Sequence, residues 1–424
     1  MSSQPETTDS PQVLVERMAI AGRAAQRALA RLTDAQKADA LRAAARALRE
    51  SEAEVLAANA RDLAAGEANG LTPAMLDRLR LDPARLAGIA DAVDQVAALP
   101  DPVGQVIDRT ERPNGLILSR VRVPIGLIGI IYESRPNVTA DAAALCLRSG
   151  NAVLLRGGSE AVHSNRAIHA ALARGLAEAG APADAVQLVP TQDRAVVGAM
   201  LTAAGLIDMI VPRGGKSLVA RVQADARVPV LAHLDGICHT YVHSAADPHK
   251  AVAVTLNAKM RRTGICGAME TLLLDAQFPG SQAVVAALLD AGCELRGDAR
   301  ARALDPRIAP ASAEDWDTEY LEAILAVAVV DGLDQAMAHI ARHSSSHTEA
   351  IVTEDAVAAE RFLAEVDSAI VMVNASTQFA DGGEFGLGAE IGIATGRLHA
   401  RGPVALEGLT TYKWQVRGTG QVRP

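Results

Sequence analysis

The chain has 424 residues, of which 49% are hydrophobic and only 2% aromatic, and its formal net charge is −9 at pH 7. This length predicts two or three domains, whose cores are built mainly from Ala, Val, Leu and Ile. An acidic balance with so few aromatic side chains argues against nucleic acid as a partner. It still allows a local basic pocket for a phosphorylated small molecule.

The sequence shows no targeting or membrane segment. The first ten residues, MSSQPETTDS, are polar and acidic, so we expect a frayed tail and not a signal peptide. The most apolar runs, PIGLIGIIY and AILAVAVV, are shorter than the roughly 20 residues of a membrane span. Four scattered cysteines without a C-x-x-C pair are typical of free thiols in a cytoplasmic enzyme. We therefore expect a cytoplasmic protein with no membrane partner.

The first hundred residues are predicted to be largely helical. Thr33 and Gln36 form a capping-box pattern before a long helix, and Thr72-Pro73 opens another helix. Residues 106–123 differ, because they alternate apolar and polar side chains around Asn114-Gly115, a pattern typical of a β-hairpin. A second alternating segment, from Leu409 to Arg417, is a candidate partner for this hairpin.

From Pro124 onward, predicted strands and helices alternate, which indicates an α/β fold with a doubly wound parallel sheet. Strands are expected at IGLIGIIY, AVLLR, AVQLVP, IDMIV and VPVLAH. A second α/β segment begins near residue 256, with strands expected at TLLLD, AILAVAVV, EAIVT and AIVMVN.

Two glycine-rich turns, 154–158 and 211–217, lead from a predicted strand into a helix. The second turn is not a P-loop, because that motif needs a glycine where Ile210 stands, and no G-x-G-x-x-G follows a strand. Either turn alone could be a simple connector. Both carry cations at carboxyl ends of strands, where ligands bind in such sheets, so we expect nucleotide phosphate there. The candidate residues are Arg156, Gly157, Gly158, Arg213, Gly214, Gly215 and Lys216.

Cys266 follows a glycine-containing loop and precedes an apolar strand. Lys259, Arg261 and Arg262 lie within seven residues of it and could favour the reactive thiolate. A lone cysteine in such a chain is usually a small hydrophobic residue, and this interpretation suits the other three cysteines. The basic loop makes Cys266 a candidate nucleophile, although spacing alone leaves both interpretations open.

The stretch NAKMRRTGICGAMETLLL around Cys266 resembles the nucleophile loop of the gamma-glutamyl phosphate reductases (glutamate-5-semialdehyde dehydrogenases) of the aldehyde-dehydrogenase superfamily. The resemblance extends over about residues 15–415. It includes the segments PIGLIGIIYESRPNVTADAAALCLRSGNAVLLRGG, IDMIVPRGGKSL, HLDGICHTYV, AMAHIARHSSSHTEAI and EFGLGAEIGIATGRLHARGPVALEGLTTYKW.

The resemblance implies an aldehyde-dehydrogenase-like fold with a Rossmann-type cofactor domain, an α/β catalytic domain and a β-hairpin oligomerisation arm. We assign residues 1–105 and 124–255 to the NADP-binding domain, 256–385 to the catalytic domain, and 106–123 with 403–424 to the arm. A homo-oligomer is expected.

The implied reaction is the NADPH-dependent reduction of L-glutamyl 5-phosphate to L-glutamate 5-semialdehyde and phosphate, the second step of proline biosynthesis from glutamate. It would pass through a thioester on Cys266, and glutamate 5-kinase is an expected partner for substrate hand-over. The resemblance also implies that Asn137 forms an oxyanion hole with the backbone N–H of Cys266. It places Glu319 at the nicotinamide ribose and Ser159 near the adenine-side ribose.

Candidates to hold the substrate are Arg135, Arg262, Ser345 and His347. A glycine-rich segment, Gly386 to Gly396, is equally a lid over the substrate or a turn between domains. His339, His343 and His347 have the i, i+4 spacing of a metal site, but the implied reaction needs no metal, and none is expected.

Three positions depart from the related sequences. Gly267 replaces an asparagine after the nucleophile, and Ser159 replaces a frequent lysine, which leaves the 2′-phosphate of NADP mainly to Arg156. Oxidising aldehyde dehydrogenases carry a water-activating Glu where this chain has His233, 33 residues before Cys266. A strand-end role for His233 is the simpler interpretation, but lack of the base favours phosphate as acyl acceptor.

Two alternatives stay open. A CoA-acylating aldehyde dehydrogenase would also lack that base. A silent member of the superfamily, acting as a binding protein, would not need Cys266 and Asn137.

Overall fold

The computed structural model describes residues 9–423, which form two compact units. The first unit contains residues 9–231, 387–392 and 404–423, and the second contains 232–386 and 393–403. Most of the polar tail predicted for residues 1–10 therefore lies outside the described residues. The division at Leu231 differs from the expected boundary at residue 255, because strand β7 (Cys238–Val242) and helix α10 (Pro248–Met260) belong to the second unit.

Five helices open the first unit: α1 (Pro11–Leu29), α2 (Asp34–Glu50), α3 (Glu52–Ala68), α4 (Pro73–Leu79) and α5 (Pro83–Ala98). The predicted capping box is present, since Thr33 and Gln36 each accept from the backbone N–H of the other. Thr72 caps α4, with Pro73 in its first turn. The helical prediction for this region is confirmed.

The sheet of the first unit has four parallel strands in the order β5-β4-β3-β6. Its strands are β3 (Leu127–Tyr132), β4 (Ala152–Gly157), β5 (Val186–Leu188) and β6 (Met209–Arg213). They alternate with α6 (Val138–Arg148), α7 (Val162–Glu178), α8 (Ala195–Thr202) and α9 (Lys216–Asp225). Helices α1, α8 and α9 bury their apolar side chains against the sheet in one core.

The segment Val228–His233 was predicted as a further strand, and this prediction is wrong. Only an isolated bridge joins Val230 to Ile210 there. The run contains Pro229, which lacks a backbone N–H and cannot donate to a sheet.

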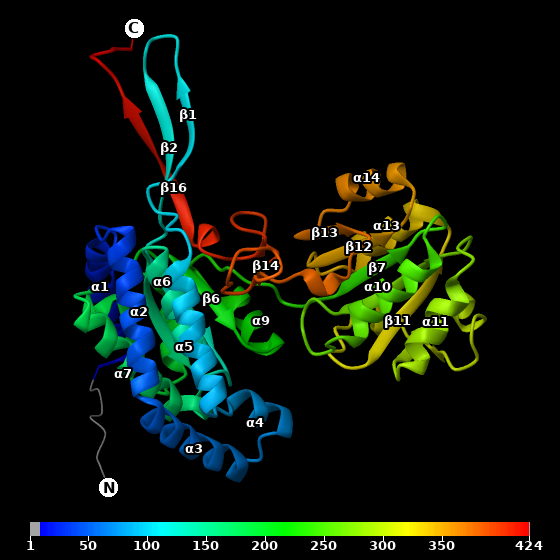
Figure 1. Cartoon of the computed structure of the whole chain (residues 1–424), viewed down its shortest axis with the longest axis horizontal. Coiled ribbons are helices and arrows are strands. Elements are labelled where there is room, and N and C mark those ends of the chain that lie inside the picture. The colour runs from blue at the N-terminus through cyan, green and yellow to red at the C-terminus, as the bar shows by residue number, and fades with distance from the viewer. Residues whose placement is uncertain (1–8, 424) are drawn as a thin grey trace. The chain divides into compact units, whose positions relative to one another are not determined.

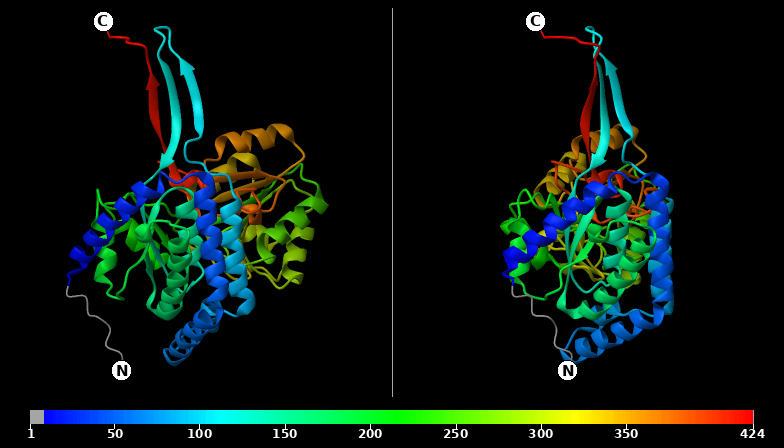
Figure 2. Two further views of the ribbon diagram at one scale, coloured as in Figure 1. Left: turned by 60° about the vertical axis from the view of Figure 1, so that its left-hand side comes forward. Right: turned by 90° about the vertical axis from the view of Figure 1, so that its left-hand side faces the viewer.

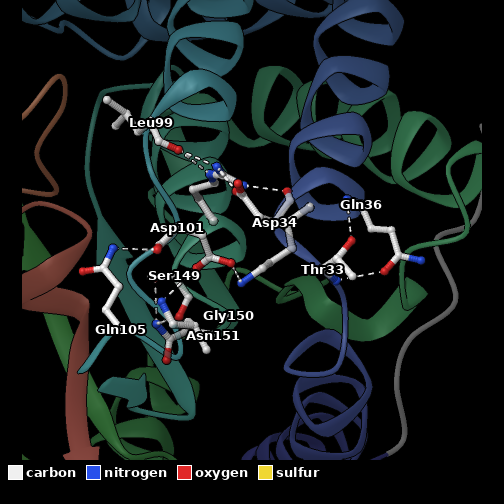
Figure 3. A network of polar contacts seen from close by, with 12 residues as sticks. Thr33, Asp34, Gln36, Leu99, Asp101, Gln105, Ser149, Gly150 and Asn151 are labelled. Carbon is white, nitrogen blue, oxygen red and sulfur yellow. Dashed lines mark hydrogen bonds and ion pairs between the residues drawn. The ribbon is translucent and has the colours of Figure 1, made fainter. Parts of the chain in front are cut away.

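Arg148, at the end of α6, ties the N-terminal helices to the sheet. Its side chain is buried, and it donates to the carbonyl oxygens of Asp34 and Leu99, each at 2.9 Å. Figure 3 shows Asp34 and Leu99 facing this network. Because a buried guanidinium needs several acceptors, these bonds fix α2 and the end of α5 beside α6.

A separate three-stranded antiparallel sheet is formed by β1 (Val106–Glu111), β2 (Ile117–Pro124) and β16 (Thr410–Arg417). The predicted hairpin and its C-terminal partner are therefore present. Figure 1 shows this sheet standing out from the helices of the first unit, and Figure 2 shows it from two further sides. Tyr412, Trp414 and Val416 are exposed on it.

The second unit is built on a parallel sheet of seven strands in the order β10-β9-β11-β8-β7-β12-β13. Besides β7, they are β8 (Met269–Asp275), β9 (Glu294–Gly297), β10 (Ala309–Pro310), β11 (Ile324–Val330), β12 (Thr348–Val352) and β13 (Ile370–Val373). The sequence predicted β8, β11, β12 and β13, but not β7, β9 or β10.

Helices cover both faces of this second sheet (Figure 1). Its main helices are α10, α11 (Ser281–Asp290), α13 (Gly332–His343) and α14 (Ala356–Glu365). Two cores result, one with α10 and α11 and the other with α13 and α14. Among residues 9–423, none of the helices combines the length and apolar composition that a bilayer span requires.

Candidate active site

Three loops meet at the carboxyl edge of the first sheet, after β3, β4 and β6. The backbone N–H of Glu133 donates to the carbonyl of Arg213 at 3.0 Å, and the Glu133 carboxylate accepts from Gly215 N–H at 3.1 Å. The Ser134 hydroxyl donates to Glu160 at 2.9 Å. The two predicted glycine turns therefore lie close together around acceptors and backbone N–H groups.

Arg156 lies at the end of β4 with its side chain largely buried. It donates to the carbonyl oxygens of Gly157 at 2.6 Å and Gln192 at 3.0 Å, while its buried Nε has no hydrogen-bond partner. Burial lowers the pKa of Arg156, against the raising effect of Glu160. An orphaned buried donor beside a glycine turn fits an anionic ligand.

The second glycine turn precedes α9, and Gly215 is the N-cap of that helix. A Cβ at Gly215 would meet nothing within 4 Å, whereas one at Gly214 would lie 2.4 Å from the Glu133 carboxylate. A glycine turn with open space at a helix N-terminus is the arrangement that admits a phosphate group.

Asn137 is the N-cap of α6, in the loop that also contains Arg135. Its side-chain amide donates to Asp141 at 2.8 Å. Burial raises the pKa of Asp141 to about 6, while Asn137 and Arg213 act in the opposite direction. Asp141, which the sequence did not single out, therefore orients the predicted oxyanion-hole amide.

The candidate nucleophile, Cys266, lies in the second unit, at the edge of the sheet where the parallel strands begin. Cys266 is in the loop between α10 and β8, directly before the strand begins. It is half-buried, whereas Cys146, Cys238 and Cys293 are buried. Burial raises the pKa of each of these three thiols, that of Cys293 to about 11. Cys266 is thus the cysteine that a substrate can reach.

His233 and His347 lie near Cys266, because the three residues precede β7, β12 and β8, which are neighbours in the sheet order β8-β7-β12. One ring nitrogen of each histidine and the Cys266 Sγ lie within 4.8 Å of one another. The ring centroids of His233 and His347 are 5.0 Å apart. Burial lowers the pKa of His347 to about 3, so this ring is neutral at neutral pH.

Gly236 packs directly against the backbone of Cys266. A Cβ at this position would lie 2.2 Å from the Cys266 carbonyl oxygen and 2.7 Å from its Cα. Glu319 accepts from Gly236 N–H at 3.0 Å, and the Ser345 hydroxyl accepts from Ile237 N–H at 2.9 Å. Two predicted ligand-binding residues therefore also hold the segment against which the candidate nucleophile packs.

The basic residues before Cys266 have other partners. Lys259 is buried in an ion pair with Glu270, with 2.5 Å between Nζ and the carboxylate. Gln378 accepts weakly from Arg261 at 3.4 Å and donates to the carbonyl oxygens of Ala258 and Arg262, each at 2.9 Å. Lys259 and Gln378 thus brace the loop, and Arg262 keeps an exposed position.

Backbone strain marks the same loops. Among the described residues, four that are not glycine have a positive φ: Ser134, Leu321, Ser346 and Asn374. Ser134 lies beside Arg135, Leu321 follows Glu319 by two residues, and Ser346 separates Ser345 from His347. Such conformations cost about 1–3 kcal/mol each and collect at functional sites.

The structure separates the predicted residues into two groups. Arg135, Asn137, the residues of both glycine turns and Ser159 belong to the first unit, whereas Arg262, Cys266, Glu319, Ser345 and His347 belong to the second. The pairing of Asn137 with the Cys266 N–H stays a prediction. The segment Gly386 to Gly396 passes from the second unit to the first and back, so its role as a lid also stays a prediction.

The histidines at i, i+4 spacing do not form one cluster. The rings of His339 and His343 lie 4.7 Å apart, and that of His339 lies 5.4 Å from Trp316. His347 follows the end of α13 and belongs with His233 and Cys266 instead. The sequence missed this grouping because CHTYV, now β7, was not identified as a strand.

Gly267, the substitution after the nucleophile, lies close to η4 (Thr377–Phe379). A Cβ there would lie 3.1 Å from the Thr377 carbonyl oxygen and 3.5 Å from the Ala380 side chain. A residue larger than glycine therefore requires its neighbours to shift by a few tenths of an ångström, and the loop can otherwise keep its conformation.

Comparisons with known proteins show the family of the chain and the fold that it shares. The aldehyde dehydrogenase family model matches residues 6–311. The gamma-glutamyl phosphate reductase of Novosphingobium aromaticivorans is 76% identical over 425 residues, which cover 100% of both chains. The crystal structure of gamma-glutamyl phosphate reductase from Thermotoga maritima has a TM-score of 0.95 at 44% identity, covering 97% of this chain and 100% of that one. An acetylating aldehyde dehydrogenase from Geobacillus thermoglucosidasius shares the fold, with a TM-score of 0.70 at 18% identity, covering 98% of both chains.

Proposed function

Since the chain belongs to the gamma-glutamyl phosphate reductases of the aldehyde dehydrogenase family, oxidoreductases of proline biosynthesis, we propose that it reduces L-glutamyl 5-phosphate through a thioester on Cys266. The products are L-glutamate 5-semialdehyde and inorganic phosphate. The observation that carries this proposal is the placement of Cys266. It is the accessible cysteine, at the edge where two histidine rings and the Gly236 backbone converge.

The chemistry at Cys266 follows from its neighbours. The thiol gives up its proton, for which the ring of His233 is proposed as a nearby acceptor, and the sulfur attacks the acyl carbon as phosphate leaves. Negative charge then grows on the carbonyl oxygen, which the Cys266 N–H and the Asn137 amide are proposed to hold. Loss of one such donor costs roughly 3–4 kcal/mol of barrier.

The proposed cofactor is NADPH, which supplies the hydride that reduces the thioester. The first unit has residues that suit a dinucleotide: the Gly214–Gly215 turn before α9, Lys216, and Arg156 with its orphaned Nε. We propose that Arg156 contacts the 2′-phosphate and that Ser159 lies beside the adenine-side ribose. Glu319 is proposed to hold the nicotinamide ribose.

Substrate binding is proposed for Arg135, Arg262, Ser345 and His347. Arg262 is exposed on the nucleophile loop, and the Ser345 hydroxyl still has a proton to donate after accepting from Ile237. His347 is fully buried, and its proposed role rests on the ring nitrogen that lies near the Cys266 sulfur.

The proposal extends to the setting of the enzyme. The exposed aromatic side chains on β16 support a role of the three-stranded sheet in forming a homo-oligomer. A cytoplasmic location and hand-over of the substrate from glutamate 5-kinase complete the proposal, since an acyl phosphate hydrolyses readily in water.

The deciding assay runs the reaction backwards. Wild-type protein with glutamate semialdehyde should reduce NADP+ only when phosphate is added, and without CoA. Cys266→Ala should lower turnover by about 10⁴-fold or more while NADPH binding persists. Cys293→Ala, a buried cysteine outside the site, is the matched control. Turnover of Cys266→Ala close to wild type would refute the thioester, and a requirement for CoA would favour the acylating alternative.

A further inference from the structure

His233, Cys266 and His347 are arranged as three ligands of a soft metal ion. Each offers one ligand atom, and these three atoms lie within 4.8 Å of one another. Tetrahedral zinc at roughly 2.0–2.3 Å from its ligands would hold them ~3.5 Å apart. The longest separation therefore has to close by about an ångström, a movement within reach of side-chain rotation. The three residues precede the adjacent strands β7, β8 and β12.

The hydrogen bond of His233 leaves it ready to bind a cation. Its Nδ1 lies 2.8 Å from the carbonyl oxygen of Ile393, which can only accept, so Nδ1 carries the ring proton. In the neutral ring the lone pair is then on Nε2. Histidines that bind metals usually donate their other N–H to a carbonyl or carboxylate in this way, which fixes both tautomer and ring orientation.

The contacts of the buried His347 ring also involve its Nδ1 atom. The Cys238 thiol donates to the Cys266 carbonyl at 3.1 Å, so its sulfur can only accept from His347 Nδ1, at 3.6 Å. Nδ1 also lies 2.9 Å from the Thr348 hydroxyl. In the tautomer in which Nδ1 donates to Cys238 or Thr348, the lone pair of His347 is on Nε2, an atom that is buried without a hydrogen-bond partner. Buried polar atoms rarely stay unsatisfied, and a bound ion would satisfy this one.

We propose that His233, Cys266 and His347 form a site for Zn²⁺ that inhibits the enzyme by holding its nucleophilic sulfur. One sulfur and two imidazole ligands favour zinc over magnesium or calcium, which prefer oxygen. The bond between zinc and sulfur forms as the thiol proton passes to water, with no change of oxidation state. The fourth ligand is water, since Cys266 is half-exposed. Binding stands on the geometry alone, whereas inhibition rests on the proposed role of Cys266.

The test uses the full chain, freed of metal and titrated first with Co²⁺ and then with Zn²⁺. One Co²⁺ should bind per chain, with the absorption of a thiolate-to-cobalt charge transfer, and Zn²⁺ should displace it. Cys266→Ser should lose this absorption. His233→Ala and His347→Ala should weaken Zn²⁺ binding at least tenfold. His343→Ala removes a histidine of the same segment outside the cluster and is the matched control, with unchanged affinity.

Because His347 is buried, its variant could fail to fold, so a measurement on the wild type accompanies the variants. Zn²⁺ should slow alkylation of Cys266 by iodoacetamide, followed by mass spectrometry, and a chelator should restore the rate. Absence of the charge-transfer band, equal Zn²⁺ affinity in wild type and His233→Ala, or no protection of Cys266 would overturn the site. Zn²⁺ that binds and protects Cys266 without stopping turnover would overturn the inhibition and the proposed thioester together, and leave the ion site supported.

Discussion

The two parallel sheets of this protein carry their candidate functional residues at opposite edges. In the first unit, the glycine turns and Asn137 follow the carboxyl ends of β3, β4 and β6. In the second unit, His233, Cys266 and His347 precede the amino ends of β7, β8 and β12. The rule that ligands bind at the carboxyl ends of parallel strands therefore describes only one of the two units.

Helix direction explains what each edge can do. Helices α6 and α9 begin at the edge of the first unit, and their N-termini carry partial positive charge that suits an anionic cofactor. Helices α10 and α13 end just before the Cys266 and His347 loops. Helix C-termini do not favour a thiolate, so the second edge relies on histidine rings and close backbone packing instead. The predictions below test this division of roles.

Among the variants that keep Cys266, the largest effect is expected from Gly236→Ala in the second unit. Its Cβ would collide with the Cys266 backbone, so the nucleophile must move, and a displacement near 1 Å can cost about 10²-fold in rate. We expect kcat/KM to fall at least that far while the dissociation constant for NADPH, from a fluorescence titration, stays within about twofold. Gly264→Ala is the matched control, because its Cβ would meet nothing closer than 3.8 Å. Equal losses in both variants would contradict the packing argument.

Arg156→Met tests the opposite edge. Removing a charge-assisted contact worth roughly 1.5–3 kcal/mol should raise KM for NADPH about tenfold or more, with KM for NADH nearly unchanged. Steady-state kinetics with the two cofactors measure this difference. Arg166→Met, on α7 and outside the glycine turns, should leave both values as in the wild type. An equal rise in KM for NADH and NADPH would show that Arg156 does not contact the 2′-phosphate.

The stability of the first unit should depend on pH through the titration of Asp141. Its folded pKa of about 6 lies above the ordinary 3.8, so its contribution to stability is complete below about pH 4 and is lost as pH rises through 6. The slope is at most about 1.4 kcal/mol per pH unit for one proton. Hydrogen exchange of the α6 amides between pH 4 and 7 measures it within the first unit. Asp141→Asn should flatten the profile, and an unchanged slope would show that another group titrates.

Gly267→Asn should have the smallest effect. The added Cβ requires the Thr377 carbonyl to move by only a few tenths of an ångström, which costs under about 1 kcal/mol, so kcat/KM should change less than about fivefold. A loss as large as that of Gly236→Ala would mean that the backbone on both sides of Cys266 must stay free of side chains.

The sequence predicted individual elements where local patterns are strong. The capping box at Thr33, the Asn114-Gly115 hairpin and the apolar strands β3, β4, β8 and β11 all depend on nearby residues, and all are present. It did not identify β7, whose CHTYV sequence mixes polar and apolar residues although every residue is buried. His239 suits this position because its backbone N–H and its ring Nδ1 both contact the carboxylate of Glu349, which lies on the neighbouring strand β12.

The sequence by itself determined the family, the loop position of Cys266 and the two glycine turns, because each rests on residues close together in the chain. Only the tertiary structure brought His233 and His347, 114 residues apart, close to Cys266. It likewise placed Gly236 against the Cys266 backbone and Asp141 within hydrogen-bond distance of Asn137. The order of strands in a parallel sheet decides which loops become neighbours, and no local pattern contains that order.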